Sequence, residues 1–169
     1  PEQAQWAENE LEPTLKKWYP RLIAEYPSKD WSAPEKVKVG FVDPPQTGAP
    51  AYTTGDSISL DRKWFSANRD SEGMGCAIHE LMHVVQSYPG GGRSIPWWLT
   101  EGIADYVRWY MFEPEKKGCE TDLSRMDVRY DGGYRQTANF LDYVERKHPG
   151  TVRSLNAVGR LGRYSPGVW

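Results

Sequence analysis

Apolar residues at the start of the chain recur at the spacing of an α-helix. Between about Ala4 and Tyr26 they stand mostly three or four positions apart, at Trp6, Leu11, Leu15, Trp18, Leu22 and Ile23. That spacing places them on one face of a helix. Pro13 and Pro20 interrupt the pattern, and a proline inside a helix removes a backbone hydrogen bond. We therefore expect a kinked helix or two short helices in this region.

The next segments alternate between polar and apolar residues, as half-buried strands do. Residues 36–42 read K-V-K-V-G-F-V and predict a strand with one buried face. Within Ala51–Leu60, two short β-prone runs flank Gly55-Asp56, which predicts a hairpin, although the dipeptide is the reverse of the commonest turn order. Together these segments predict a small sheet.

The rest of the chain is predicted to be mainly helical. Four further helices are expected at about Asp70–Gln86, Ser94–Met111, Tyr134–Lys147 and from Val152 onward. The first is expected to be capped by Asp70-Ser71-Glu72 and to end at the glycines after Tyr88. Residues 112–133 are rich in Pro, Gly and charged residues and predict a long loop. The last helix is expected to break at Ser165-Pro166-Gly167.

Length and charge narrow the class of protein. A chain of 169 residues without repeats or a linker predicts a single domain over residues 1–169. The formal charge of −2 argues against a nucleic-acid or anionic-membrane partner, which would favour a basic excess. No apolar run approaches the roughly 20 residues that cross a bilayer. The polar start shows no signal-peptide pattern, so if the protein is secreted we expect its leader to have been removed. We expect a monomer.

Cysteine and aromatic content each leave two interpretations open. Cys76 and Cys119 are compatible with one disulfide in an oxidising compartment or with two buried thiols. Eight Trp and ten Tyr residues are typical of amphipathic core and rim positions. They could also form stacking platforms in a cleft for sugars or aromatic side chains.

The sequence H-E-L-M-H at residues 79–83 carries the most specific chemistry in the chain. In a helix, residues i and i+4 lie on one face, so His79 and His83 point to one place. Zn²⁺ binds imidazole nitrogen at about 2.0–2.1 Å and accepts such a pair directly. Glu80 can reach the open position of the metal and take a proton from its bound water. Two of the three histidines in the chain lie in this motif, which argues against coincidence.

Glu101 is the candidate third zinc ligand. Residues 98–106, W-L-T-E-G-I-A-D-Y, follow a glycine-rich turn that can reverse the chain, and seventeen residues separate His83 from Glu101. Asp105 is four residues after Glu101 and so shares its helix face. There it could accept the far N–H of a ligating histidine, for which we favour His79. A Glu/Asp pair at this spacing is otherwise typical of a solvated face, but the apolar residues around it indicate partial burial.

These residues resemble a known class of enzymes. H-E-x-x-H followed by W-L-x-E-G-x-A is similar to the gluzincin metallopeptidases, in which that glutamate is the third zinc ligand. More narrowly, the segments 79–86, 98–108 and 131–143 resemble the basic secretory protein family of plants, fungi and bacteria, and Ala51–Phe65 is also similar. The resemblance covers roughly residues 35–160. Two departures are the slightly acidic charge and the end at Trp169, where the family is expected to continue with more helix.

The resemblance implies both a fold and an activity. The fold would be α+β and zincin-like, with a small mixed or antiparallel sheet packed on the active-site helix and a mainly helical C-terminal part. Whether the chain is truncated or processed at its C-terminus, or is a shorter variant, stays open. The activity would be zinc-dependent hydrolysis of peptide bonds by a metal-bound water, with Glu80 as general base. The substrates would be extracellular proteins or glycoproteins cut as by an endopeptidase, and the location secreted or otherwise extracytoplasmic.

Two further sets of residues complete the predicted site. Gluzincins stabilise the oxyanion with a tyrosine or histidine outside the zinc motif. Tyr134, after two glycines, matches the family in this role, with Tyr106 second; the alternative for Tyr134 is an aromatic that packs on its neighbour. His148 is better interpreted as a cation at a helix C-terminus.

The predicted substrate site lies on the hairpin. An extended peptide would add a strand to an edge of the sheet within Ala51–Leu60. This makes Tyr52, Thr53 and Thr54 the candidate substrate-binding residues. Which of the two short strands forms the edge stays open.

Two other functions stay open. One is a catalytically weak, zinc-containing secreted protein of defence or glycan binding, supported by the tryptophan content and opposed by the intact Glu80. The other is an exopeptidase, for which the sequence shows no motif that would capture a substrate N-terminus.

Overall fold

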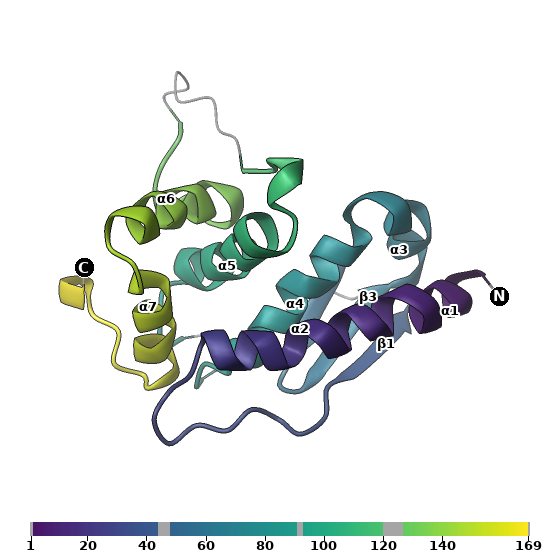
Figure 1. The fold of residues 1–169 in the computed structure, drawn as a ribbon, viewed down its shortest axis with the longest axis horizontal. Coiled ribbons are helices and arrows are strands. Elements are labelled where there is room, and N and C mark those ends of the chain that lie inside the picture. Colours follow the sequence, from purple (N-terminus) through teal and green to yellow (C-terminus); the bar gives the residue numbers. More distant parts are fainter. Residues whose placement is uncertain (1, 44–47, 91–92, 120–126, 169) are drawn as a thin grey trace. The chain divides into compact units, whose positions relative to one another are not determined.

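The chain forms two compact units. The computed structural model describes residues 2–43, 48–90, 93–119 and 127–168. Unit 1 comprises residues 1–25 and 31–85, and unit 2 comprises residues 26–30 and 86–169. Figure 1 labels the α-helices and the strands β1 and β3. Within the described ranges, no helix has the length and apolar character needed to span a membrane. The expected single domain stays a prediction.

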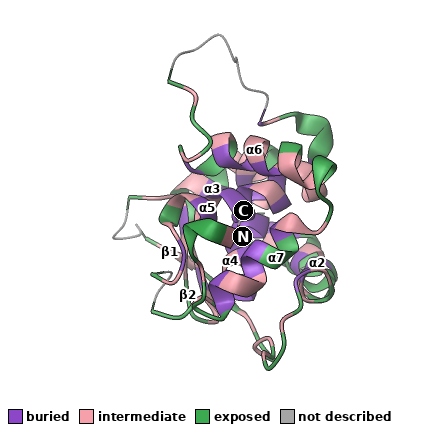
Figure 2. Cartoon of the chain, turned by 90° about the vertical axis from the view of Figure 1, so that its left-hand side faces the viewer, coloured by how far each residue is buried: buried purple, intermediate pink, exposed green. Residues whose placement is uncertain are grey.

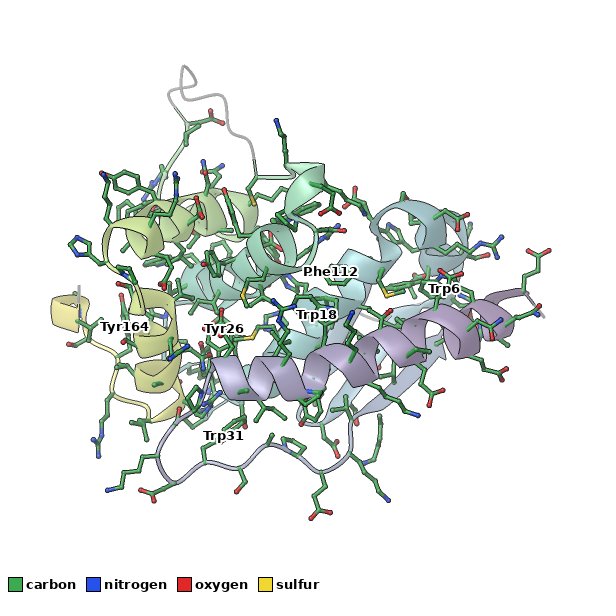
Figure 3. The ribbon with its side chains drawn as sticks, viewed as in Figure 1. Trp6, Trp18, Tyr26, Trp31, Phe112 and Tyr164 are labelled. Atoms are coloured by element: carbon green, nitrogen blue, oxygen red, sulfur yellow. The ribbon has the colours of Figure 1, made fainter. Side chains whose placement is uncertain are left out.

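Unit 1 begins with one helical segment. It consists of α1 (Glu2–Trp6), the π-helical η1 (Ala7–Leu11) and α2 (Glu12–Glu25). The Glu12 N–H bonds to the Ala7 carbonyl, five residues back. Pro13, which has no N–H for the carbonyl four residues back, follows this wider turn directly. The helix is therefore confirmed, and its interruption is a π turn rather than a break. Trp6 and Trp18, labelled in Figure 3, are both buried.

A three-stranded mixed sheet follows in unit 1. Its strands are β1 (Lys38–Val42), β2 (Ala51–Thr54) and β3 (Ser57–Asp61), in the order β1-β3-β2. β2 pairs antiparallel with β3, and β1 pairs parallel with β3. The hairpin is confirmed, and Gly55 has a φ of +59°. A glycine with positive φ first in the turn is typical of type II′, which explains the order Gly-Asp. The α+β class is confirmed.

The expected buried face of β1 is wrong. Val39 is 39% exposed, and no residue of β1 is buried. β1 lies at an edge of the sheet with β3 as its neighbour, whereas the central strand β3 buries Ile58 and Leu60. Alternation in sequence indicates which residues share a face of the strand. It does not indicate whether another element covers that face.

The helix that carries H-E-L-M-H is the most buried element of unit 1. It is α4 (Met74–Gln86), preceded by α3 (Arg62–Asn68) and the π-helical η2 (Arg69–Gly73). Every residue of α4 is buried except Met74 and His83, which are half-buried, and Figure 2 shows this burial along the chain. The predicted end of the helix at Gln86 is confirmed.

The predicted cap at residues 70–72 is wrong. These residues lie inside η2, and the non-helical residue before that turn is Asn68, with φ −119° and ψ 11°. The side chain that caps a helix here is Asp61, which accepts a hydrogen bond from the Trp64 N–H at 2.8 Å. Asp61 therefore starts α3, and the chain is already helical before it reaches Asp70.

Unit 2 is built from helices. They are α5 (Trp97–Tyr106), η3 (Val107–Phe112), η4 (Pro114–Lys116), α6 (Tyr134–Lys147), α7 (Thr151–Arg160) and η5 (Pro166–Val168). The helix expected to reach about Met111 continues through the π-helical η3, and both predicted ends of α6 are confirmed. The expected loop contains η4, and its residues 120–126 lie outside the described ranges. α7 ends at Arg160, before Gly162 with φ +66° and earlier than the predicted break.

The two cysteines are buried thiols, one in each unit. This selects the second of the two interpretations that the sequence left open. Burial, followed by the charge of Asp105, raises the pKa of Cys119 to about 12. The Cys119 thiol is therefore protonated and unreactive at neutral pH.

Gly102 allows α5 and α6 to pack closely. A Cβ atom at this position would overlap Thr137 Cγ2 and lie 2.6 Å from Thr137 Cβ. Thr137 is held in place because its hydroxyl accepts a hydrogen bond from the Gly133 N–H at 3.0 Å and donates one to the Tyr130 carbonyl at 2.8 Å. The glycine beside Glu101 is therefore required by packing.

We expect Gly102→Ala to lower the free energy of unfolding, because overpacking usually costs about 1–3 kcal/mol. This loss should exceed the roughly 1 kcal/mol by which alanine favours a helix. Chemical denaturation measures it. Thr137→Ser keeps the hydroxyl and removes Cγ2, so adding it to Gly102→Ala should recover part of the loss. An unchanged unfolding midpoint in Gly102→Ala would contradict this account of the packing.

Candidate metal centre

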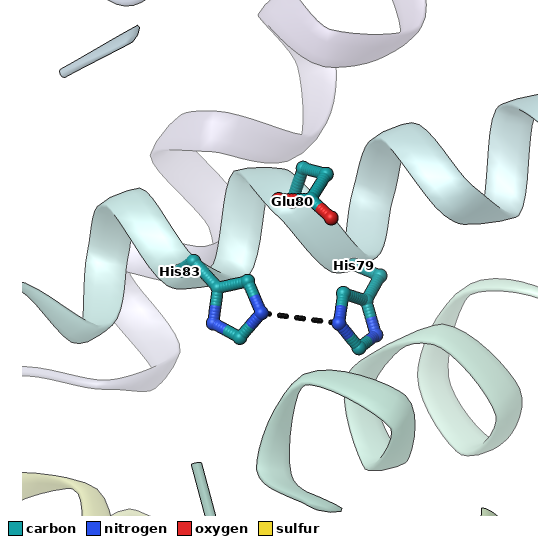
Figure 4. Close-up of side chains that lie close together, drawn as sticks. All are labelled: His79, Glu80 and His83. Carbon is teal, nitrogen blue, oxygen red and sulfur yellow. Dashed lines mark hydrogen bonds between the residues drawn. The ribbon is translucent and has the colours of Figure 1, made fainter. Parts of the chain in front are cut away.

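α4 brings three of the predicted residues together. The Nε2 atoms of His79 and His83 lie 3.1 Å apart and are joined by the dashed line in Figure 4. The ring centroids are 4.7 Å apart, and the ring planes are inclined by 82°. One ligand atom from each of His79, Glu80 and His83 lies within 4.8 Å of the others. The convergence expected from helix spacing is therefore seen within unit 1.

The two histidines suit a zinc ion. Two nitrogen ligands of a tetrahedral Zn²⁺, at about 2.0–2.1 Å from the metal, lie roughly 3.3 Å apart. The distance of 3.1 Å between the two Nε2 atoms is close to that value. Both rings present the same nitrogen to one point, and a neutral imidazole nitrogen is a preferred zinc ligand. The donor set therefore fits the metal that the motif predicts.

The carboxylate of Glu80 is held by the sheet. Thr53 Oγ1 donates a hydrogen bond to Glu80 Oε2 at 2.7 Å and also lies 3.1 Å from the Glu80 carbonyl oxygen. Glu80 is only 6% exposed. Thr53 stands opposite Ile58 in the hairpin and so shares the buried face of the sheet. The sheet thus packs on the helix that carries the histidines, as expected for this fold.

The structure shows which strand of the hairpin is the edge. Among the described strands, β3 is central and β2 is outermost, so no described strand pairs with the outer edge of β2. Thr53 faces Glu80, whereas Tyr52 and Thr54 lie on the opposite face of the strand. The three predicted substrate-binding residues are therefore divided between the two faces of β2.

Glu101 and Asp105 lie on α5 in unit 2. Glu101 is half-buried and Asp105 is buried. Their apolar surroundings, including the buried Leu99 and Ile103, confirm the expected partial burial. His79 and His83 belong to unit 1, so the role of Glu101 as a ligand and of Asp105 as the partner of His79 stay predictions.

Tyr134 opens α6 in an unusual conformation. Its φ is +45°, a left-handed value that residues other than glycine rarely adopt. Its side chain is 51% exposed, and its ring centroid lies 6.3 Å from that of Trp97. Strained backbone of this kind is concentrated at functional sites. Both sequence interpretations remain compatible with this geometry, because the ring packs on a neighbour while the side chain stays accessible.

Tyr106 and His148 were also considered for stabilising the oxyanion. Tyr106, the second candidate for the oxyanion, is half-buried and stacks on Tyr110 with a centroid distance of 5.7 Å. His148 is exposed and follows the last residue of α6, at the helix C-terminus as expected.

Comparison with known families decides the class of protein. Residues 18–169 match the model of a family described as peptidase of plants and bacteria, abbreviated BSP. The chain belongs to this family. The resemblance to the basic secretory protein family is thereby confirmed, and this BSP-family protein is a peptidase that acts on peptides or proteins. No curated protein matches it, and neither does any solved structure.

Two contacts of the BSP-family peptidase were not predicted from the sequence. The hydroxyl contact of Thr53 with Glu80 joins segments that are 27 residues apart, so no local pattern indicates it. Gln86, the last residue of α4, is buried in unit 2 and donates a hydrogen bond from Nε2 to the Thr100 carbonyl at 2.8 Å. A buried amide at the end of an apolar helix was the available signal, since a polar group there requires a partner.

Proposed function

We propose that this peptidase depends on zinc, which is held by His79, His83 and Glu101, with Glu80 as general base. The observation that carries the proposal is the convergence of the two Nε2 atoms, 3.1 Å apart, beside a buried glutamate. Three protein ligands with an open fourth position are typical of catalytic zinc sites, whereas structural sites are closed by a fourth protein ligand. Asp105 is assigned to orient His79 through the ring N–H that faces away from the metal.

The residues of the chain divide the chemistry between them. When bound, zinc supplies a Lewis acid that polarises the scissile carbonyl and lowers the pKa of water. Glu80 takes the proton of the attacking water and delivers it to the leaving amine. The phenol of Tyr134 donates a hydrogen bond to the oxyanion, an interaction often worth about 3–4 kcal/mol.

The substrate is assigned to the free edge of β2. An extended peptide would pair its main chain with the strand, with Tyr52, Thr53 and Thr54 as its contact residues. Strand pairing requires neither terminus of the substrate, which favours an endopeptidase. Secretion and extracellular proteins or glycoproteins as substrates belong to the proposal on the strength of the family resemblance, and the expected monomeric state belongs to it as well.

One observation favours a second candidate function, glycan binding with weak catalysis. Trp97 is 60% exposed and Tyr134 is 51% exposed, and sugar rings stack on accessible aromatic faces. A protein of this class would have no use for a buried carboxylate beside its histidines. Glu80 and its bond to Thr53 therefore favour the peptidase.

Treatment with a chelator tests the proposal. The purified protein should cleave internal bonds in a diverse peptide library, lose this activity in chelator and regain it with about one Zn²⁺ per chain. Mass spectrometry identifies the cut sites, and elemental analysis gives the zinc content. His83→Ala should abolish zinc binding, whereas His148→Ala, at an exposed position outside the motif, should keep both zinc and activity. Cleavage that survives complete metal removal would refute zinc dependence, and glycan binding without cleavage would support the second candidate.

A further inference from the structure

We propose that Thr53 is a positioning residue, which fixes the Glu80 carboxylate with its hydroxyl while its own main chain faces the edge where the peptide docks. This inference rests on the proposed function of Glu80 and β2. It assigns to Thr53 a role beyond contact with substrate.

The hydroxyl of Thr53 has one proton and two nearby acceptors, both from Glu80. The Glu80 carbonyl lies inside α4, where a carbonyl accepts the N–H four residues further on. The carboxylate is therefore the acceptor that most needs the hydroxyl. Its distance of 2.7 Å from Thr53 Oγ1 falls in the range of hydroxyl bonds to a charged oxygen.

The conformationally restricted side chain of Thr53 holds the flexible side chain of Glu80. Threonine is β-branched and has a restricted χ1 angle, and Thr53 lies in a paired strand opposite Ile58. Glutamate has three rotatable side-chain bonds, and a general base must lie within about 2.6–3.2 Å of the proton that it takes. Because Glu80 is buried, water does not readily replace the hydroxyl of Thr53. The bond therefore restricts the carboxylate to one orientation.

The main chain of Thr53 faces the free edge of β2. In an antiparallel pair, residues that exchange hydrogen bonds alternate with residues that do not. The Asp61 N–H bonds to the Pro50 carbonyl at 2.8 Å, which makes Pro50 and Asp61 a bonded pair. Counting along the hairpin, Tyr52 and Ser59 form the next bonded pair, and Thr53 and Ile58 form a non-bonded pair. The N–H and C=O of Thr53 therefore point away from β3.

Thr53 would thus interact with both the general base and the peptide substrate. Its backbone groups are available to the main chain of a peptide added at the edge, and its side chain holds the base. The register of the peptide and the position of Glu80 are consequently set by the same strand residue. This coupling predicts that the hydroxyl affects turnover more than peptide binding.

Substitutions that remove or keep the hydroxyl of Thr53 test the positioning role. Thr53→Val replaces the hydroxyl with a methyl group of similar size and should lower kcat about 10- to 100-fold, with KM changed by less than about threefold. Thr53→Ser keeps the hydroxyl and should keep kcat within about threefold of the wild type. Zinc content should stay at the wild-type level in both. In a Glu80→Gln background, Thr53→Val should cause no further loss of turnover and leave the affinity for an uncleaved peptide unchanged.

The possible outcomes separate the two proposals. An active, chelator-sensitive wild type together with undiminished kcat in Thr53→Val overturns the positioning role alone. The positioning role is also overturned if Thr53→Ser loses as much kcat as Thr53→Val. It is likewise overturned if Thr53→Val lowers the turnover of Glu80→Gln by the same factor as that of the wild type. A wild type that cleaves no peptide overturns the proposed function and this inference with it. If Thr53→Val does not fold, Thr53→Ala removes the same hydroxyl without adding a methyl group beside the carboxylate, and the same results decide.

Discussion

Glu80→Gln should lower the kcat of the peptidase by at least about a hundredfold while zinc stays bound, since general-base catalysis typically contributes 10²–10⁴-fold. Glutamine has the size of glutamate, and its amide oxygen can still accept the hydrogen bond from Thr53. The buried surroundings of the residue are therefore preserved. The amide, however, cannot take a proton from water. Turnover of a cleavable peptide and the zinc content of the same sample measure the two effects.

A matched variant separates this effect from a general loss of negative charge. Glu115 is exposed on η4, so Glu115→Gln makes the same chemical change away from the site and should keep both turnover and zinc. Normal peptidase activity in Glu80→Gln would remove Glu80 as the base. A loss of zinc in that variant would instead place Glu80 among the ligands, since its carboxylate lies within the group formed with His79 and His83.

The part of the site that lies on one helix could be predicted from the sequence. The convergence of His79 and His83 depends only on the helical repeat, and the motif specifies both residues. The bond between Thr53 and Glu80 depends on how the hairpin packs against α4. That packing is a property of the folded chain, and no spacing within either segment indicates it.

The fold shows the same division between local and non-local causes. The hairpin at Gly55 and the ends of α6 follow from local signals, and both were predicted. The exposure of β1 was not predicted, because an alternating pattern does not indicate whether another element covers the strand. Residues 70–72 match a cap pattern, but the upstream cap at Asp61 had already started helical structure.

The backbone of Tyr134 shows a further limit of sequence patterns. Two glycines before this residue predicted a flexible turn, and Gly133 does have a φ of +79°. Tyr134 also adopts a positive φ, which its side chain disfavours. The ring of Trp97 lies against Gly133, where a Cβ atom would come within 2.5 Å of it. Such a contact between α5 and the start of α6 arises only after the two helices pack.

Replacement of Glu101 should strongly weaken zinc binding. Removing a residue that hydrogen-bonds a metal ligand typically lowers metal affinity 10–100-fold. Removing an anionic ligand itself should therefore lower zinc affinity by at least about a hundredfold. Glu101→Gln keeps the size of the side chain and removes its charge. Titration with Zn²⁺ against a competing chelator measures the affinity, and Asp105→Asn should give a smaller loss if that residue orients His79.

The stability of the zinc-free protein is the control for this test. α5 is held against α6 by the close contact of Gly102 with Thr137, and the Thr100 carbonyl is bonded by Gln86. Comparing the melting temperature of the zinc-free Glu101→Gln variant with that of the zinc-free wild type measures what the carboxylate contributes to stability. Wild-type zinc affinity in this variant would exclude Glu101 from the ligand set. A reduced affinity with an unchanged zinc-free melting temperature would show that its charge acts on the metal rather than on the stability of the helix.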